Sequence, residues 1–218
     1  MNDHISYDDF DPASADHTTR WSWTIYRPED EKARVTLTLG PGESPDPKLE
    51  DRLWTAVGGD WKLGTRRHEP SELLPYGAPH PSKRAAILDD LEARLEAAGV
   101  AGASAVQALP TGWLRIGMVL VDRLCKWAAE EEPARIQDIK EKFGSLRVYT
   151  YGSDRVADLS DWCEEQSVCR CMATGKEGHS CNTGWVLTLS DNMFALYQED
   201  RRAVERMMYP PREGADRS

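Results

Sequence analysis

Three cysteines and a histidine lie close together in the sequence, and their side chains are typical zinc ligands. Cys169 and Cys171 form one close pair, and His179 and Cys181 form another. Zn²⁺ takes thiolate and imidazole ligands in a tetrahedron. The four residues could therefore supply three sulfurs and one nitrogen, and the metal would order a segment rich in Gly, Thr and Ser. In the alternative interpretation the cysteines are reduced thiols in a loop and bind no metal.

A group of basic residues surrounds an aromatic one further upstream. Lys140, Lys142 and Arg147 flank Phe143, and interleaved basic and aromatic side chains are typical of surfaces that bind nucleic acid. However, residues 110–151 hold seven basic and six acidic residues, and affinity for phosphates rises with the number of charges that are neutralised. The sequence therefore favours a solvated hairpin, in which Phe143 and Leu146 pin the turn and the core, and nucleic-acid binding stays an alternative.

The residues that hydrolytic enzymes use are poorly arranged. No histidine lies beside an obvious nucleophile and carboxylate. The sequence contains no phosphate-binding glycine loop, no dinucleotide fingerprint and no His-Glu-x-x-His motif. We therefore expect no catalytic residues and no enzyme. A hydrolase with a site between two halves of the chain is a third interpretation, but no particular residue supports it.

The tryptophans could form a surface that binds another protein. Eight tryptophans are many for 218 residues, and this side chain is enriched at interfaces because it buries a large area with little loss of rotamer freedom. We expect Trp113, Trp127 and Trp185 to fill the core. The sequence predicts an exposed, partner-binding aromatic face from Trp21, Trp23, Trp54 and Trp61.

Composition limits the classes of function. The chain has 27 Lys and Arg against 37 Asp and Glu, a formal charge of −10, and such a chain repels phosphate backbones. No apolar run approaches the ~20 residues of a membrane span. The first 20 residues contain five Asp and no apolar h-region, which is unlike a secretory signal. We expect a cytoplasmic protein with reduced cysteines.

The pattern of apolar residues predicts an α+β protein with two parts. In the amino-terminal part, alternation over 21–26 and 35–39 predicts a hairpin, and Asp46-Pro47 starts a helix that ends before Gly58. In the carboxyl-terminal part a small α+β domain with a cysteine-bearing knuckle is expected. Its elements are helices from Ser82 to Gly99, from Thr111 to Glu130 and from Ser153 or Asp154, a hairpin over 135–142 and 145–151, a strand over 185–189, and one helix from Asp191 to Met208.

These elements suggest a division of the chain. Segments rich in Pro, Gly and polar residues cannot bury enough apolar surface to offset the entropy of ordering. The expected parts are a disordered acidic tail (1–19), the hairpin and helix (20–65), a Pro-rich linker (66–81), a helix with a small-residue connector (82–109), the α+β domain (110–209) and a disordered tail (210–218).

Several motifs carry a resemblance to known proteins. They are the pair Gly112-Trp113, the sequence IKEKFGSLRVY over 139–149, the cysteine cluster, and GWVLTL over 184–189. Together they resemble an uncharacterised family of small bacteriophage and bacterial proteins, over about residues 112–193. The resemblance implies a phage or mobile-element setting, a small α+β domain and a metal knuckle, and it implies no activity that can be named.

The sequence departs from that family in its knuckle. The family has a Cys-x-x-Cys pair, but here a single residue separates Cys169 from Cys171, and Ser190 and Met193 replace the second pair. Serine and methionine are poor zinc ligands. The family's own metal site is therefore not preserved, which leaves only the substitute set described above.

The function expected from these observations is binding without catalysis. An acidic chain without a catalytic set, of phage or mobile-element type, is expected to be an accessory, anti-defence or toxin-immunity protein that covers a surface of another protein. The alternative from another class is a zinc-knuckle accessory protein that binds nucleic acid through Lys140, Lys142 and Arg147.

Overall fold

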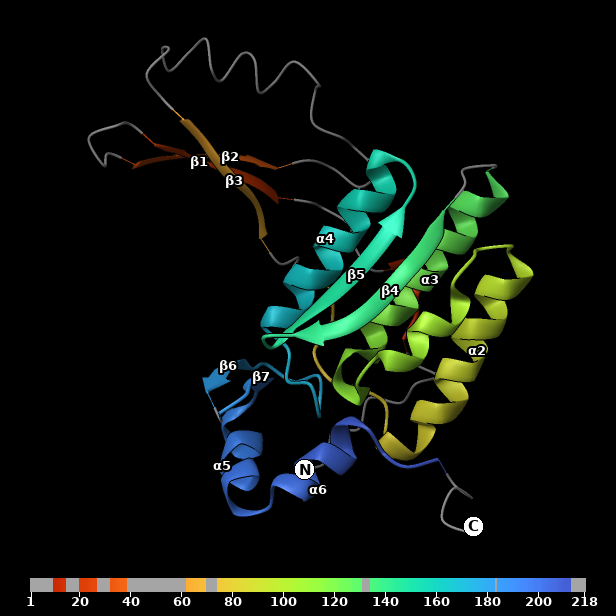
Figure 1. The fold of residues 1–218 in the computed structure, drawn as a ribbon, viewed down its shortest axis with the longest axis vertical. Coiled ribbons are helices and arrows are strands. Elements are labelled where there is room, and N and C mark those ends of the chain that lie inside the picture. Colours follow the sequence, from red (N-terminus) through yellow and green to blue (C-terminus); the bar gives the residue numbers. More distant parts are fainter. Residues whose placement is uncertain are drawn as a thin grey trace. The chain divides into compact units, whose positions relative to one another are not determined.

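The α+β class predicted from the sequence is confirmed (Figure 1). The computed structural model describes residues 10–14, 20–26, 32–38, 62–69, 74–130, 134–182 and 184–212. The chain divides into two compact units. One is Asp16–Leu73, and the other combines Met1–Ala15 with Leu74–Ser218.

The smaller unit contains a three-stranded antiparallel sheet. Its strands are β1 (Arg20–Tyr26), β2 (Lys32–Thr38) and β3 (Lys62–Glu69), in the order β2-β1-β3. The predicted hairpin is confirmed as β1 and β2, in which Trp23 pairs with Val35. Strand β3 was not predicted, and it occupies the first residues of the expected linker over 66–81. Its sequence KLGTRRHE shows no apolar alternation, and an edge strand is held by backbone hydrogen bonds that any residue can make. The helix predicted after Asp46 lies outside the described residues.

Two helices form the centre of the larger unit. Helix α2 (Arg84–Ala97) packs on α3 (Leu114–Ala129), and a 3-10 helix, Ala103–Ala108, lies between them in the sequence. Helix α2 buries one apolar stripe, Ile87, Leu88, Leu91 and Leu95. Helix α3 also contacts α4, so its first eight residues are all buried. The helix and connector expected as a separate part over 82–109 thus belong to the same packed unit as the residues that follow.

A hairpin with a helix behind it follows. Strands β4 (Arg135–Lys142) and β5 (Ser145–Tyr151) pair in antiparallel fashion at the predicted boundaries. Helix α4 (Asp154–Val168), with Ser153 as its N-cap, packs on β5 and on α3. Figure 1 shows this helix running behind the hairpin. The buried residues Ile136, Ile139, Leu146 and Val148 form the inner face of the hairpin.

The last part of the chain adds a small hairpin and two short helices. Strands β6 (His179–Asn182) and β7 (Val186–Leu189) pair, and helices α5 (Asp191–Glu199) and α6 (Arg201–Met208) follow. The single helix predicted from Asp191 is wrong, because the backbone leaves the helical region at Asp200 (φ −140°, ψ 84°). The carboxylate of Asp200 accepts a hydrogen bond from the Ala203 N–H at 3.0 Å and caps α6.

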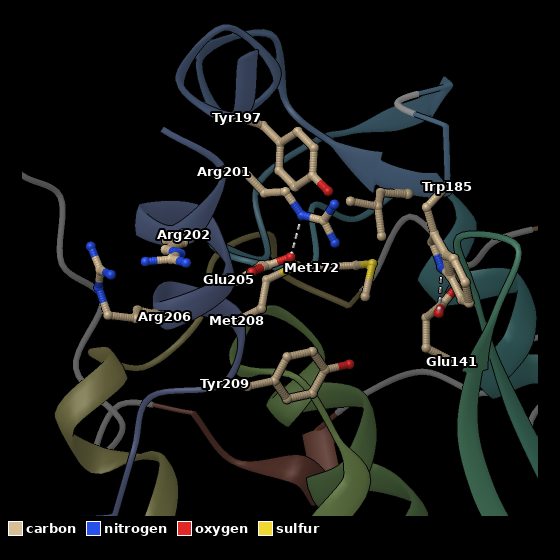
Figure 2. A pocket seen from close by; sticks show the side chains of 11 residues that line it. Glu141, Met172, Trp185, Tyr197, Arg201, Arg202, Glu205, Arg206, Met208 and Tyr209 are labelled. Carbon is tan, nitrogen blue, oxygen red and sulfur yellow. Dashed lines mark hydrogen bonds and ion pairs between the residues drawn. The ribbon is translucent and has the colours of Figure 1, made fainter. Parts of the chain in front are cut away.

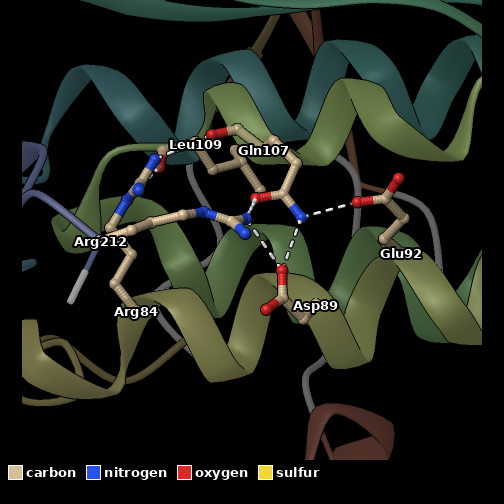
Figure 3. A network of polar contacts seen from close by, with 6 residues as sticks. All are labelled: Arg84, Asp89, Glu92, Gln107, Leu109 and Arg212. Atoms are coloured by element: carbon tan, nitrogen blue, oxygen red, sulfur yellow. Dashed lines mark hydrogen bonds and ion pairs between the residues drawn. The ribbon is translucent and has the colours of Figure 1, made fainter. Parts of the chain in front are cut away.

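Both ends of the described chain are attached to the larger unit. Phe10 is buried, and the 3-10 helix Pro12–Ser14 contacts α3, which differs from the expected mobile tail over 1–19. Near the other end, Arg212 donates to Asp89 at 2.9 Å and to Gln107 at 2.8 Å (Figure 3). The disordered tail expected from 210 therefore does not include Arg212.

No helix in the described part of the chain combines the length and the apolar character that crossing a bilayer requires.

Candidate protein-binding groove

A groove of about 640 Å³ opens between α6, β7 and the end of β4. Its apolar floor consists of Met172, Leu187 and Met208, which are all buried. Backbone contacts fix this floor, because the Met172 N–H donates to the Thr188 carbonyl at 2.9 Å and the Thr111 hydroxyl donates to the Met208 carbonyl at 3.1 Å. The floor is thus a preformed apolar surface inside a polar rim.

Three aromatic side chains line the groove, from the residue before β7, from α5 and from the residue after α6 (Figure 2). Tyr197 is buried, whereas Trp185 exposes 62% of its surface and Tyr209 exposes 40%. The expectation that Trp185 fills the core is therefore wrong. Trp185 directly precedes β7, and the short hairpin holds its ring over the groove with solvent on the other side.

Glu141 joins the two hairpins at the tryptophan end of the groove. Its carboxylate accepts a hydrogen bond from Trp185 Nε1 at 3.3 Å and another from the Gly144 N–H at 2.7 Å. The Thr188 hydroxyl donates to the Gly144 carbonyl at 2.6 Å. These bonds lock β7 to the turn between β4 and β5, so the position of Trp185 is set by residues far away in the sequence.

Tyr209 closes the other wall of the groove. The Arg84 guanidinium lies over its ring, 5.5 Å from the centroid. Desolvation raises the pKa of Tyr209 to about 12, with a smaller contribution from the negative charge of Glu141 and an opposing one from Arg84. At neutral pH the groove therefore presents a neutral phenol here.

Arginines from α6 form the rim opposite Trp185. Arg201 donates to Glu205 at 2.6 Å and lies over the Tyr197 ring, and Arg206 lies 4.0 Å from the Asp200 carboxylate. Arg202 forms no ion pair with any residue that the structure describes. The sequence predicted a single helix through Arg201 and Arg202. The break at Asp200 starts a new helix there, and its arginines line the groove.

The four expected zinc ligands do not converge. Cys171 and Cys181 are buried, Cys169 is half-buried, and His179 is exposed with its Nε2 atom 3.7 Å from Asp191. The Cys169 thiol donates to the Gln166 carbonyl and accepts from Arg170 at 3.4 Å. Among the described residues no group of three or more His, Cys, Asp or Glu side chains is placed to hold a metal ion.

Backbone hydrogen bonds hold the segment where the metal knuckle was expected. The Cys171 N–H donates to the Lys176 carbonyl, and the Gly175 N–H donates back to the Cys171 carbonyl, both at 2.8 Å. Of the positions that replace the family's second pair, Ser190 is the N-cap of α5 and Met193 packs against the core. Hydrogen bonds and apolar packing thus order this segment, for which the sequence analysis considered a metal ion.

The basic residues of the expected nucleic-acid site are largely neutralised. Lys140 forms an ion pair with Asp138, and Arg147 forms one with Glu164. Lys142 lies over the Phe143 ring, 5.5 Å from its centroid. Phe143 lies in the turn before Gly144 and is 68% exposed, so of the two residues expected to pin the turn and the core only Leu146, which is fully buried, packs into the core.

The expected amino-terminal aromatic face lies mostly beyond what the structure describes. Trp21 and Trp23 belong to strand β1, of which only the backbone is described. Trp54 and Trp61 lie outside the described residues. Trp113 and Trp127 are buried as expected, and Cys163 lies in the core while Cys125 packs against it.

One histidine lies beside a hydroxyl. His80 Nδ1 is 2.9 Å from the Ser82 hydroxyl and accepts from the Ser82 N–H at 3.3 Å. Both contacts span two residues at the start of the exposed 3-10 turn Pro81–Lys83. This geometry is that of a turn cap rather than of a nucleophile activated by a base.

Comparison of the chain with protein-family models, with curated proteins and with solved structures gives no match.

Proposed function

We propose that the protein is a non-enzymatic binding module that modulates another protein by covering part of its surface, and that the groove of Trp185 and α6 is its contact site. The observation that supports this most is the exposed indole of Trp185 at the end of a groove with a buried apolar floor. Burying the exposed part of a tryptophan side chain on binding contributes about 3 kcal/mol.

The rigidity of the groove favours a binding role. Glu141, Gly144 and Thr188 tie the two hairpins together through hydrogen bonds of 2.6–3.3 Å. A binding surface that is already ordered loses little conformational entropy when a partner arrives, so more of the contact energy appears as affinity. The wall of two tyrosines and a tryptophan is also the composition that protein interfaces favour.

The biological role rests on the resemblance. Proteins of phage or mobile-element type act as accessory, anti-defence or immunity factors. Occlusion of a partner surface suits a chain with a charge of −10 whose sequence contains none of the catalytic motifs considered above.

Nucleic-acid binding through Lys140, Lys142 and Arg147 is the weaker candidate. Two of these three side chains are already paired with carboxylates, so a phosphate would have to displace an existing ion pair in a chain of net negative charge.

A peptide selection tests the proposed contact site. A random peptide library displayed on a carrier is selected on immobilised wild-type protein and, in parallel, on the Trp185→Ala variant. We expect enriched peptides that bind wild-type protein and lose at least tenfold in affinity for Trp185→Ala, because the loss of about 1.4 kcal/mol or more corresponds to that factor.

The matched control is Tyr151→Ala. Tyr151 exposes 61% of its surface, against 62% for Trp185, but it lies on β5 and does not line the groove. Circular dichroism shows whether both variants keep the fold. Peptides that bind wild-type protein and Trp185→Ala equally, or that lose affinity equally for both variants, contradict the proposed site.

A further inference from the structure

The groove has two chemically different ends. Figure 2 shows Arg202 and Arg206 on one side and the Trp185–Glu141 pair on the other, with Met172 between them. All three arginines that line the groove come from α6. The Arg201 guanidinium lies near Met172 in the middle of the groove, and those of Arg202 and Arg206 lie farther from Trp185. A ligand in the groove therefore meets positive charge at one end, an apolar floor in the middle, and a carboxylate beside an indole at the other end.

The three arginines differ in how closely they pair with carboxylates of the protein itself. Arg201 is engaged by Glu205 at 2.6 Å, and Arg206 is only weakly paired at 4.0 Å from Asp200. Arg202 is exposed and makes no ion pair within the described part of the chain. Arg202 and Arg206 are four residues apart on α6, so they lie on the same side of the helix. These two side chains are the ones available to a ligand.

The positive charge of this rim contrasts with the net negative charge of the chain. Acidic residues outnumber basic ones by 37 to 27 in the sequence, yet the α6 end of the groove carries three arginines and one glutamate. A guanidinium at the edge of an apolar surface forms hydrogen-bonded pairs with carboxylates that are partly shielded from water. Arg202 and the weakly paired Arg206 thus favour carboxylates of a ligand at this end of the groove.

We infer, on the basis of the proposed function, that the groove takes an acidic segment of a partner protein that carries a large apolar side chain next to Asp or Glu residues. The apolar side chain lies on the floor of Met172, Leu187 and Met208 under Trp185. The neighbouring carboxylates pair with Arg202 and Arg206.

An acidic peptide fits the groove better than a nucleic acid does. The floor offers apolar contacts without hydrogen-bond donors for phosphates. Glu141 occupies the aromatic end, where a stacked base would bring its own phosphate close to a carboxylate. Three arginines with Glu141 and Glu205 leave only one net positive charge, which is little for a phosphate chain.

A charge reversal tests the inference. The peptide selection is repeated with Arg202→Glu, and Lys126→Glu serves as the control with the same change of charge. Lys126 is exposed in the last turn of α3, at the opposite end of that helix from Thr111, which contacts Met208. Arg202 is exposed on α6, so the substitution is expected to leave the fold intact.

The expected result has three parts. Peptides enriched on wild-type protein combine Asp or Glu with Trp, Phe, Leu or Met. The consensus peptide, made synthetically, binds Arg202→Glu about tenfold more weakly and binds Lys126→Glu within about twofold of wild type. A version of the peptide with Lys in place of its acidic residues binds Arg202→Glu more tightly than it binds wild type.

Three other outcomes are distinguishable. Neutral or basic peptides that depend on Trp185 overturn the inference and leave the proposed contact site standing. An absence of peptides that depend on Trp185 contradicts the proposed site, and the inference fails with it. Binding of fluorescent dT20 or rU20 that Arg202→Glu abolishes and Lys126→Glu does not assigns the rim to nucleic acid and overturns the inference.

Discussion

Two arginine side chains, Arg115 and Arg170, lie inside the larger unit with 3% of their surface exposed. Arg115 donates to the carbonyls of Pro75 and Tyr76 at 3.3 and 3.0 Å, and Arg170 donates to the Leu74 carbonyl at 2.5 Å. Burial lowers the pKa of both guanidinium groups, and Arg170 further lowers that of Arg115. The two side chains therefore hold the segment that enters the larger unit against α3 and the turn after α4.

Replacing Arg170 tests whether these hydrogen bonds stabilise the larger unit. Arg170→Ala removes hydrogen bonds to the Gln166 and Leu74 carbonyls and the contact with the Tyr76 ring, 4.7 Å from its centroid. We expect a loss of about 3 kcal/mol in the free energy of unfolding, because hydrogen bonds to charged groups contribute about 1.5–3 kcal/mol each and the lost charge returns part of its desolvation cost. Urea unfolding followed by circular dichroism measures the change.

Arg202→Ala is the control at the same scale, because Arg202 is exposed and forms no ion pair among the described residues. Its effect on the free energy of unfolding is expected within about 0.5 kcal/mol. Equal midpoints for the two variants would show that the buried arginine contributes no more than a surface one.

At the scale of elements, the floor of the groove depends on a close contact between two turns. The 3-10 turn Thr111–Trp113 approaches the turn after α4, where the Gly112 N–H donates to the Met172 carbonyl at 2.8 Å. The indole of Trp113 donates to the Arg170 carbonyl at 2.9 Å. Any Cβ atom on Gly112 would overlap the Cys171 carbonyl oxygen. The absence of a side chain at Gly112 thus fixes how near these turns come.

A pair of glycine substitutions separates close approach from backbone strain. Gly112→Ala is expected to lower the free energy of unfolding by about 3 kcal/mol, because backbone atoms must move apart. Gly99 has a φ of +74° but no heavy atom within 4 Å of a Cβ position. Gly99→Ala is therefore expected to lower the free energy of unfolding by only about 1–2 kcal/mol, which is the cost of a left-handed backbone conformation for alanine.

Both values come from denaturant unfolding under identical conditions. A cost for Gly112→Ala no larger than that for Gly99→Ala would mean that the two turns separate easily, and the groove floor would then not be preformed.

The larger unit as a whole is built from two stretches that are not continuous in sequence. Phe10 is buried, and the Arg115 guanidinium lies over its ring at 5.0 Å from the centroid. The Arg123 guanidinium reaches the Ala13 carbonyl at 3.4 Å. A residue that precedes the smaller unit thus completes the core of the larger one.

Phe10→Ala tests this arrangement. We expect it to lower the melting temperature by roughly 6–20 °C, because truncating a buried phenylalanine costs about 3–5 kcal/mol and each kcal/mol shifts the melting temperature of a unit of this size by about 2–4 °C. Phe143→Ala is the matched control, since Phe143 exposes 68% of its surface at the tip of a turn. If both variants melt alike in differential scanning calorimetry, Phe10 does not belong to the core.

Sequence patterns predicted those helices and strands in which the apolar residues follow a single regular spacing. The β4–β5 hairpin has its expected boundaries because Phe143-Gly144 marks the turn and Leu146 and Val148 alternate on β5. On β4 a bulge between Ile136 and Asp138 interrupts the alternation. The same reasoning missed the break at Asp200, since Phe194, Tyr197, Val204 and Met208 keep a helical spacing across it. Strand β3 was missed because its polar residues show no period at all.

The sequence by itself determined the α+β class, the helices α2, α3 and α4 and both long hairpins, because local periodicity and turn residues act within about ten positions of each other. Only the tertiary structure decided that Glu141, Trp185, Arg202 and Tyr209 line one groove. These residues come from segments far apart in the chain, and their meeting depends on the packing of one turn on another. No periodic pattern records such long-range contacts.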